Sequence, residues 1–386
     1  MAGSVPATDR VAAVDALRGF ALLGILLVNI WYFADSTTLS GGPLPATASA
    51  PDLAVRFLVT TLFEGKFYLL FSLLFGYGSA VLRDRAGGQA VHLTSRRLGF
   101  LAVLGILHGA TLFYGDILLT YALAGSLLLA TRSLAPRVEL LLAVAITAAM
   151  ALLLVSSALL TGPAEAAATA VGDSAVEDPA VGPAGALAAN AATYGVIGIN
   201  VVVFQGPLAL AAFYAGSALA AWGVLRPSAP PKPLLRRLVL LTLPAGLVLS
   251  AGQAWLALRG DDGSTLLASG ISVLVSPLVT IGYAAGFLLL LGTRPGRVVS
   301  RVLAPMGRLS LSNYVAQSAL LGLVFTGYGL GLQDRLPAVV VVLVGVAVYL
   351  VQAVASRLLL RRFASGPLEW ALRRVTYGRS ARHDGA

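Results

Sequence analysis

His108 and Asp116 are the residues whose types and spacing are best suited to acid–base chemistry. They lie close together in the string GILHGATLFYGDILLTYAL, where two apolar runs meet. An imidazole beside a carboxylate can act as a general base with the group that orients it. A structural reading is also open. In that reading His108 hydrogen-bonds a neighbouring helix, and Asp116 caps a helix that begins at Ile117.

Further polar residues are expected near the same end of their apolar runs as that pair. Asn29 lies near the end of the first run, and Glu64 and Lys66 lie at the start of the second. Gln205 lies on a later run. We predict one water-accessible polar pocket, with Asn29 and Glu64 as further catalytic candidates. Lys66 and Gln205 are substrate-binding candidates, although Glu64 and Lys66 could simply neutralise one another.

Two residue pairs are candidates for substrate binding near the opposite ends of the apolar runs. Asp15 and Arg18 in VDALRGF are three positions apart, so they share a helix face and can form an ion pair. That pair could orient the first helix, or Arg18 could bind a phosphate-bearing donor. Asn313 and Gln317 in GRLSLSNYVAQS are four positions apart. They could form interhelical hydrogen bonds or line a cavity.

Several kinds of site are excluded by composition. The chain has no cysteine, which rules out disulfides, thiolate nucleophiles and cysteine-ligated metals. The three histidines, His92, His108 and His383, are too widely spaced to predict a metal cluster. We therefore expect no metal site and no bound cofactor.

The elements that hold these residues are predicted to be membrane helices. Of the 386 residues 58% are hydrophobic and 11% are charged, against roughly 25% charged in an ordinary soluble domain. A spanning helix needs about 20 mostly apolar residues. About ten runs qualify, and an all-α polytopic membrane protein is expected. The runs are residues 14–33, 67–82, 97–113, 117–131, 138–161, 201–225, 236–258, 266–292, 309–330 and 337–360.

The basic residues predict how these helices are oriented. Most of the 27 Lys and Arg residues fall in alternate loops and in the tail, while the opposite loops hold only Arg56, Arg259 and Arg335 with several acids. The positive-inside rule then places both termini in the cytoplasm of a bacterial inner membrane. The net charge of +10 is thus an orientation signal, and no nucleic-acid partner is expected.

Three further sequence features predict how the chain is organised. The Pro-rich segment 226–236 predicts a cytoplasmic linker between an N-terminal half, residues 1–225, which holds the polar pocket, and a C-terminal half, residues 237–386. Residues 52–82 would be too long for one spanning helix, so a break is expected at Glu-Gly-Lys, residues 64–66. The basic and aromatic tail predicts an interfacial helix.

Five strings spread over nearly the whole chain resemble the YeiB-like bacterial membrane proteins, a family with a domain of unknown function (number 418). The strings are VDALRGFALLGILLVNI, EGKFYLLFSLLFGYG, GILHGATLFYGDILLTYAL, GRLSLSNYVAQS and GPLEWALRRVTYG. A more distant resemblance involves Asp15, Arg18, Gly19 and Asn29, whose spacing is similar to that in the first helix of heparan-alpha-glucosaminide N-acetyltransferase and its bacterial relatives.

The distant resemblance implies an enzyme that moves an acyl group from cytosolic acyl-CoA to a sugar on the far side of the membrane, with Asn29 in the catalytic site. Those acetyltransferases have an essential histidine soon after the asparagine. This chain has no histidine between Asn29 and His92. Either His108 or one of the acids Asp35, Glu64 and Asp116 would take its place, or the acyl-transfer chemistry is absent.

The leading hypothesis is therefore an inner-membrane acyltransferase-like protein. Acyl-CoA would be the co-substrate, approaching Arg18 and the cytoplasmic arginines. His108, oriented by Asp116, would deprotonate a sugar or another small acceptor, while Asn29 steadies the thioester or its oxyanion. The alternative is a transporter or exporter of a small metabolite or lipid-linked molecule, and a third reading is a non-catalytic scaffold. The bilayer is the expected partner, and the sequence is compatible with an oligomer.

Overall fold

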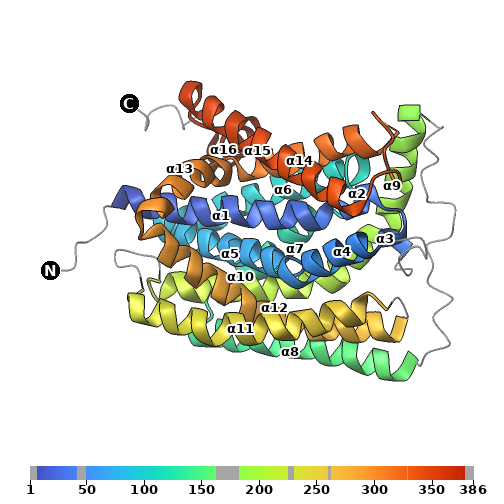
Figure 1. Ribbon diagram of the computed structural model, residues 1–386. Helices are drawn as coiled ribbons and strands as arrows, with labels where there is room; N and C mark the ends of the chain where they lie inside the picture. The colour runs from blue at the N-terminus through green and yellow to red at the C-terminus, as the bar shows by residue number, and fades with distance from the viewer. Residues whose placement is uncertain are drawn as a thin grey trace.

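The structure is a computed structural model that describes residues 7–40, 49–161, 182–224, 230–259, 262–327 and 329–378. Every regular element in these ranges is a helix, and most helices lie side by side along one direction (Figure 1). In chain order they are α1 (Ala7–Asn29), α2 (Trp31–Ala34), α3 (Thr37–Ser40), α4 (Ala50–Leu62), α5 (Lys66–Ala86), η1 (Gly87–Gln89), α6 (Ala90–Thr111), α7 (Leu118–Ala130), α8 (Pro136–Thr161), α9 (Gly182–Asn200), η4 (Val201–Gln205), α10 (Gly206–Ala221), α11 (Lys232–Ala257), α12 (Asp262–Leu291), α13 (Arg294–Arg308), α14 (Ser310–Phe325), α15 (Ala338–Arg362) and α16 (Pro367–Tyr377). The expected all-α class is confirmed.

Seven helical stretches in the described residues are long and apolar enough to cross a membrane. They are Ala12–Ala34, Ala50–Thr111, Pro136–Leu160, Gly182–Ala221, Lys232–Ala257, Gly263–Leu291 and Ala338–Arg362. Two of the ten expected spans, residues 67–82 and 97–113, fall together in the second stretch. Two others, residues 117–131 and 309–330, fall on the shorter helices α7 and α14. The exact number of crossings stays a prediction.

The outer face of the bundle is suited to lipid. On α8, Leu141 and Leu152 are exposed, and on α11 Leu240, Leu241 and Val248 are exposed. These two helices lie along one side of the bundle (Figure 1). Contiguous apolar side chains on the surface are costly in water, and a bilayer would cover them. The chain therefore has the helices and the surface of a multi-pass membrane protein.

The expected break at residues 64–66 is confirmed. Helix α4 ends at Leu62 and α5 begins at Lys66, with Gly65 between them at a φ of 77°. A Cβ at Gly65 would lie 2.6 Å from the Ser276 hydroxyl of α12. Both the backbone conformation and the close contact therefore require glycine at this position.

The two predicted halves pack against each other through α1 and α13. A Cβ at Gly19 would lie 2.3 Å from the carbonyl oxygen of Leu303, and one at Gly307 would lie 1.7 Å from that of Asp15. Glycines at both positions let the two backbones touch. The predicted linker, 226–236, lies partly outside the described residues, and α11 begins within it at Lys232.

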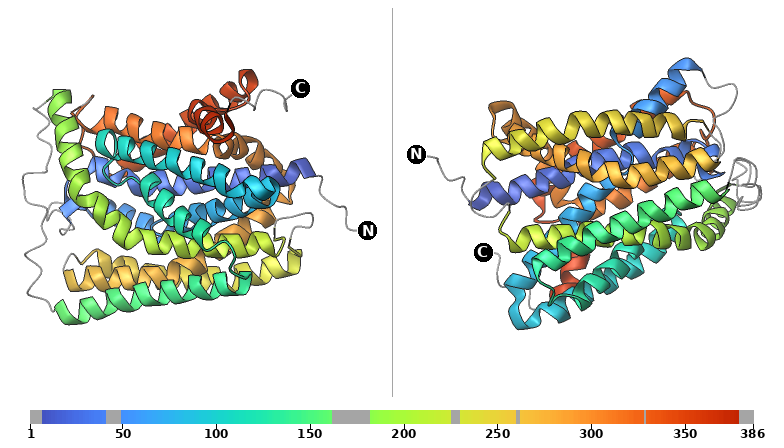
Figure 2. Two further views of the ribbon diagram at one scale, coloured as in Figure 1. Left: turned by 180° about the vertical axis from the view of Figure 1, so that it is seen from behind. Right: turned by 90° about the horizontal axis from the view of Figure 1, so that it is seen from below.

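One end of the bundle holds α13, α16 and the described start of α1, while α2 and α3 lie at the opposite end (Figures 1 and 2). The first of these ends is the more basic, because α13 and α16 carry six arginines: Arg294, Arg297, Arg301, Arg308, Arg373 and Arg374. The positive-inside rule predicts that this end faces the cytoplasm. The membrane side of the termini stays a prediction.

Candidate functional site

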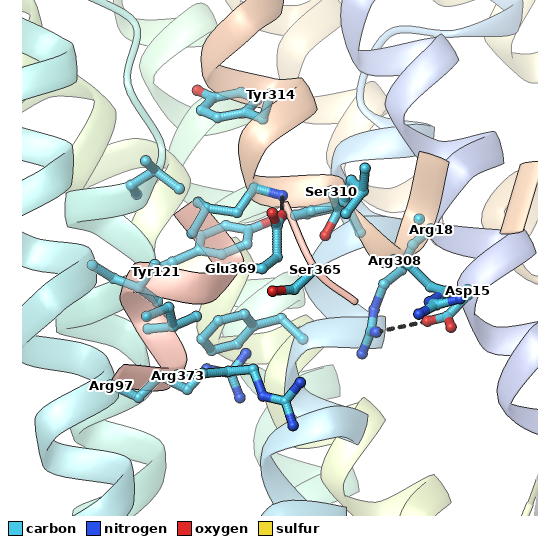
Figure 3. Close-up of a pocket in the computed structure, with 18 of the residues that line it drawn as sticks. Asp15, Arg18, Arg97, Tyr121, Arg308, Ser310, Tyr314, Ser365, Glu369 and Arg373 are labelled. Atoms are coloured by element: carbon cyan, nitrogen blue, oxygen red, sulfur yellow. Dashed lines mark hydrogen bonds and ion pairs between the residues drawn. The ribbon is translucent and has the colours of Figure 1, made fainter. Parts of the chain in front are cut away.

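A cavity of about 380 Å³ enters the bundle from the end that holds α13 and α16. Its entrance is lined by the exposed residues Arg308, Ala364 and Arg373. Its inner end is lined by buried, mainly apolar residues of α6, α7, α14 and the segment before α7: Leu101, Ile117, Leu118, Tyr121 and Tyr314. The cavity thus joins a charged mouth to an apolar floor (Figure 3).

The mouth has a surplus of positive charge. Four arginines line the cavity, namely Arg18, Arg97, Arg308 and Arg373, against the two carboxylates Asp15 and Glu369, so the lining has a net charge of +2 (four minus two). Asp15 is paired with Arg18, at 3.2 Å between Oδ1 and Nη1. A cleft with such a surplus attracts anionic ligands.

Glu369 of α16 forms hydrogen bonds with the start of α14. Its Oε1 accepts hydrogen bonds from the backbone N–H groups of Leu311 (2.9 Å) and Ser312 (3.0 Å). Its Oε2 accepts one from the Ser312 hydroxyl at 2.5 Å. The first N–H groups of a helix have no partner within the helix and favour a nearby negative charge. Glu369 therefore fixes α14 against α16 rather than opposing the arginines.

Replacing Glu369 by alanine should destabilise the protein by about 1–2 kcal/mol, because the first turn of α14 loses its acceptors. The thermal melting temperature in detergent measures the effect. Glu369→Gln should have a melting temperature between those of the wild type and Glu369→Ala, since an amide oxygen still accepts hydrogen bonds. An alanine variant that melts like the wild type would show that the contact does not hold α14.

Arg97 of α6 is placed for ligand binding. Its guanidinium lies over the ring of Phe75, 4.8 Å from the ring centre. Its Nε is buried and has no hydrogen-bond partner within the part of the chain that the structure describes. A buried guanidinium donor without an acceptor is costly. Arg97 also lines the cavity, where its charge would favour an anionic ligand.

Behind the cavity floor, His108 is held in a chain of hydrogen bonds. Its Nδ1 lies 2.8 Å from Asp116 Oδ1, and its Nε2 lies 2.9 Å from Ser318 Oγ. The three residues are 2%, 2% and 4% exposed. If Asp116 is the acceptor, Nδ1 donates to it, and Nε2 can then accept from the Ser318 hydroxyl. The expected His108–Asp116 pair is present, and Ser318 joins it.

The glycines of α6 make this arrangement fit. A Cβ at Gly105 would lie 2.4 Å from the backbone nitrogen of Leu119 and 2.8 Å from Asp116 Oδ2. The segment between α6 and α7 can therefore fold back against α6. Asp116 Oδ2 also accepts from the Leu119 N–H at 3.0 Å. Asp116 thus combines both of the roles that the sequence left open, since it orients His108 and satisfies the start of α7.

One layer of residues separates this network from the cavity. The Tyr314 ring lines the cavity floor, and its centre lies 5.2 Å from that of the His108 ring. The Ile117 N–H points to the Tyr314 hydroxyl at 3.4 Å. Tyr314 and Ser318 are four positions apart on α14, so they share one face. The cavity therefore runs from Arg18 to the immediate neighbours of His108.

The structure places the other pocket candidates apart from this network. Asn29 ends α1, and Glu64 lies in the turn before α5. Lys66 is 1% exposed, and its Nζ donates to the Thr60 carbonyl at 3.0 Å. Gln205 ends η4, where its carbonyl accepts from a tyrosine hydroxyl at 2.6 Å. No hydrogen bond among the described residues joins these four side chains to His108, and their functional roles stay predictions.

Asn313 and Gln317 lie on another face of α14, as their spacing predicts. The Asn313 side chain donates to the Met306 carbonyl (3.2 Å) and to the Ser356 hydroxyl (2.9 Å). Its backbone carbonyl accepts from Gln352 Nε2 at 3.0 Å. Gln317 is buried, and neither residue lines the cavity. Asn313 makes the interhelical contacts that were one of the two expected roles.

Comparisons with known proteins give the family. Residues 219–379 match a family model described as a protein of unknown function, DUF418. The uncharacterized protein YxaH of Bacillus subtilis is 30% identical, with 96% of this chain and 94% of that protein covered. A 39.9 kDa protein from the amylase 3′ region of Bacillus acidopullulyticus is 29% identical, with 96% and 95% covered. YeiB of Escherichia coli is 28% identical, with 95% and 96% covered.

No solved structure gives a significant match to the chain. The relatives are matched over nearly their full lengths. The YeiB-like resemblance that the sequence strings predict is confirmed. This chain belongs to the DUF418 family.

Proposed function

We propose that this protein is a membrane acyltransferase, which takes an acyl group from acyl-CoA and passes it to a hydroxyl or amine of a small acceptor such as a sugar. The observation that supports this most is the position of one cavity. It runs from a mouth with four arginines to the residues that touch His108. A phosphate-rich donor with an apolar acyl chain matches both ends.

The donor would bind with its phosphates at the mouth. Arg18, Arg97, Arg308 and Arg373 offer planar donor groups that suit phosphate oxygens. The acyl chain would lie against the apolar wall of Phe71, Phe75 and Leu101. A volume of about 380 Å³ lies within the usual range for small-molecule pockets, roughly 300–1,000 Å³. On the predicted orientation the mouth faces the cytoplasm, the source of the donor.

The chemistry would fall to His108. Asp116 holds the imidazole with Nε2 free of a proton, which is the state that a general base requires. The resemblance to the acetyltransferases implies Asn29 as the group that steadies the thioester carbonyl, although Asn29 does not line the cavity. The acceptor would enter from the end of the bundle opposite to the mouth.

Donor binding gives a prediction of its own. Arg97→Gln and Arg373→Gln should each weaken the binding of a thioether analogue of acyl-CoA by about tenfold, because each removes a charge-assisted contact to phosphate. Titration calorimetry on protein in nanodiscs measures the Kd. Arg301→Gln on α13 is the matched control, since Arg301 is exposed and does not line the cavity. Equal losses in all three variants would mean that the analogue binds only through the general surface charge.

Transport is the second candidate, and the burial of Lys66 favours it. A lysine that is 1% exposed among apolar helices is costly, and such groups often mark ion or substrate pathways. Flux assays in proteoliposomes separate the two functions. Protein-dependent movement of an unmodified substrate, abolished in Lys66→Met and unaffected by acyl-CoA, would favour transport over acyl transfer.

A further inference from the structure

Ser318, like Ser72 and Ser217, has its hydroxyl bonded to a side chain of another helix, and its partner is an imidazole. A serine in such a helix commonly donates to the carbonyl four residues before it. Ser79, Ser126 and Ser269 do so, at 2.9, 2.7 and 2.9 Å. The Ser318 hydroxyl instead lies 2.9 Å from His108 Nε2. Its partner comes from a different helix, 210 residues away in the chain.

This contact decides which group His108 can activate. Nδ1 is engaged with Asp116, so Nε2 is the nitrogen that can take a proton. The group in hydrogen-bond contact with Nε2 is the Ser318 hydroxyl. A serine whose hydroxyl contacts a histidine that is oriented by a carboxylate is the arrangement that activates a seryl nucleophile. Before any acyl group is bound, the base is therefore directed at Ser318.

Ser318 is also placed close to the donor site. It lies one helical turn beyond Tyr314, on the same face of α14, and Tyr314 lines the cavity floor. The hydrogen bond from the Ile117 N–H to the Tyr314 hydroxyl is long, at 3.4 Å. For a donor in the cavity to reach Ser318, the Tyr314 side chain would have to move aside.

We propose that Ser318 is the nucleophile of this protein and that it forms a covalent acyl-serine ester. This inference rests on the proposed acyltransferase function. In the first step Ser318 Oγ attacks the thioester carbonyl, and its proton passes to His108 Nε2. The C–S bond breaks, and the thiolate takes the proton from His108 and leaves as the free thiol of CoA.

In the second step the acceptor completes the transfer. Its hydroxyl or amine attacks the acyl-serine carbonyl while His108 Nε2 takes its proton. The bond between the carbonyl carbon and Ser318 Oγ breaks, and the serine oxygen regains the proton from His108. The product is an ester or an amide of the acceptor. Such a reaction has two half-reactions, so donor and acceptor are expected to follow ping-pong kinetics.

A fluorophosphonate probe tests the nucleophile directly. Full-length protein in nanodiscs is incubated with an alkyl fluorophosphonate, and the labelled residue is found by peptide mass spectrometry. We expect labelling at Ser318, none in Ser318→Ala, and at least 100-fold slower labelling in His108→Gln. Ser126→Ala, which removes an exposed serine of α7, should label like the wild type. Labelling that persists in Ser318→Ala would overturn the proposal.

Two further variants keep the test decisive. Tyr314→Ala opens the cavity floor, so absence of labelling in both this variant and the wild type would also overturn the proposal. The chain has no cysteine, so Ser318→Cys introduces the single thiol of the protein. Its alkylation by iodoacetamide should be at least tenfold faster with His108 present than in the double variant with His108→Gln. Equal rates would contradict activation by His108.

The result separates this inference from the proposed function. If the wild type transfers acyl groups and Ser318→Ala transfers them equally fast, then the acceptor attacks the donor directly, and the acyl-serine is wrong while the acyltransferase stands. If the probe labels Ser318 but no acyl-CoA is consumed, then the nucleophile is supported and the acyltransferase is wrong.

Discussion

Replacing His108 by glutamine will lower acyl transfer by roughly 10³-fold or more, because the base that is hydrogen-bonded to both Ser318 and Asp116 is lost. Glutamine is close to histidine in size and can still hydrogen-bond, so the helices should stay packed. The rate of release of free CoA from acyl-CoA, in the presence of an acceptor, measures the loss. The melting temperature shows that the variant is folded.

His92→Gln is the matched control for this experiment. His92 is an exposed residue on the same helix, α6, and it does not line the cavity. Its replacement should leave the rate within a factor of two of the wild type. A folded His108→Gln protein that transfers acyl groups at the wild-type rate would remove His108 from the mechanism.

Replacing Gly105 by alanine will disturb both the fold and the site. The added Cβ would lie 2.4 Å from the backbone nitrogen of Leu119 and 2.8 Å from Asp116 Oδ2. These contacts are mainly with fixed atoms, so the segment before α7 must move away from α6. We expect a loss of stability of about 2–3 kcal/mol and a fall in transfer of roughly 100-fold, since Asp116 would no longer orient His108. Melting temperature and transfer rate measure the two effects.

Gly99→Ala isolates the steric cause. Gly99 lies on the same helix, and a Cβ there would meet nothing within 4 Å. Alanine is favoured over glycine inside a helix by about 1 kcal/mol, so this variant should be as stable as the wild type or more so. If Gly105→Ala behaved like Gly99→Ala, the close approach of α7 to α6 would not matter.

The sequence predicted the features that depend on local patterns. The break at Gly65 followed from the length of the apolar run and from Glu-Gly-Lys, and the structure has it. His108 and Asp116 were predicted as a pair because only a short segment separates them. Asn313 and Gln317 were predicted on one face from their spacing. Each of these inferences uses residues close together in the chain, where helix geometry fixes the relation.

Ser318 was missed because its partner is distant in the chain. A serine on an apolar helix usually bonds to its own backbone, and no local pattern distinguishes it from Ser79 or Ser126. One signal was present, since Ser318 lies four positions after Tyr314 in a helix rich in polar residues. That spacing puts both side chains on one face. It does not show that the face meets His108.

The cytoplasmic arginines were predicted as an orientation signal and, with Arg18, as the groups that acyl-CoA would approach, but the sequence did not predict that four of them line one cavity. Arg97, Arg308 and Arg373 lie in three separate segments that the sequence assigns to the cytoplasmic side. Bringing them around one cavity depends on the packing of α13 against α1 and of α16 over α14. These are contacts between distant helices, which hydropathy and charge patterns do not specify.

The most direct test of the central claim follows an acyl group through the purified protein. Protein in nanodiscs is incubated with acetyl-CoA labelled in the acetyl group, together with sugar and amine acceptors, and the label is followed on CoA, protein and acceptor. The account predicts that label leaves CoA far faster with the wild type than with His108→Gln, and that it is recovered on the acceptor. Folded wild-type protein that neither binds acetyl-CoA nor releases its label, with longer-chain acyl-CoA giving the same result, would contradict the account.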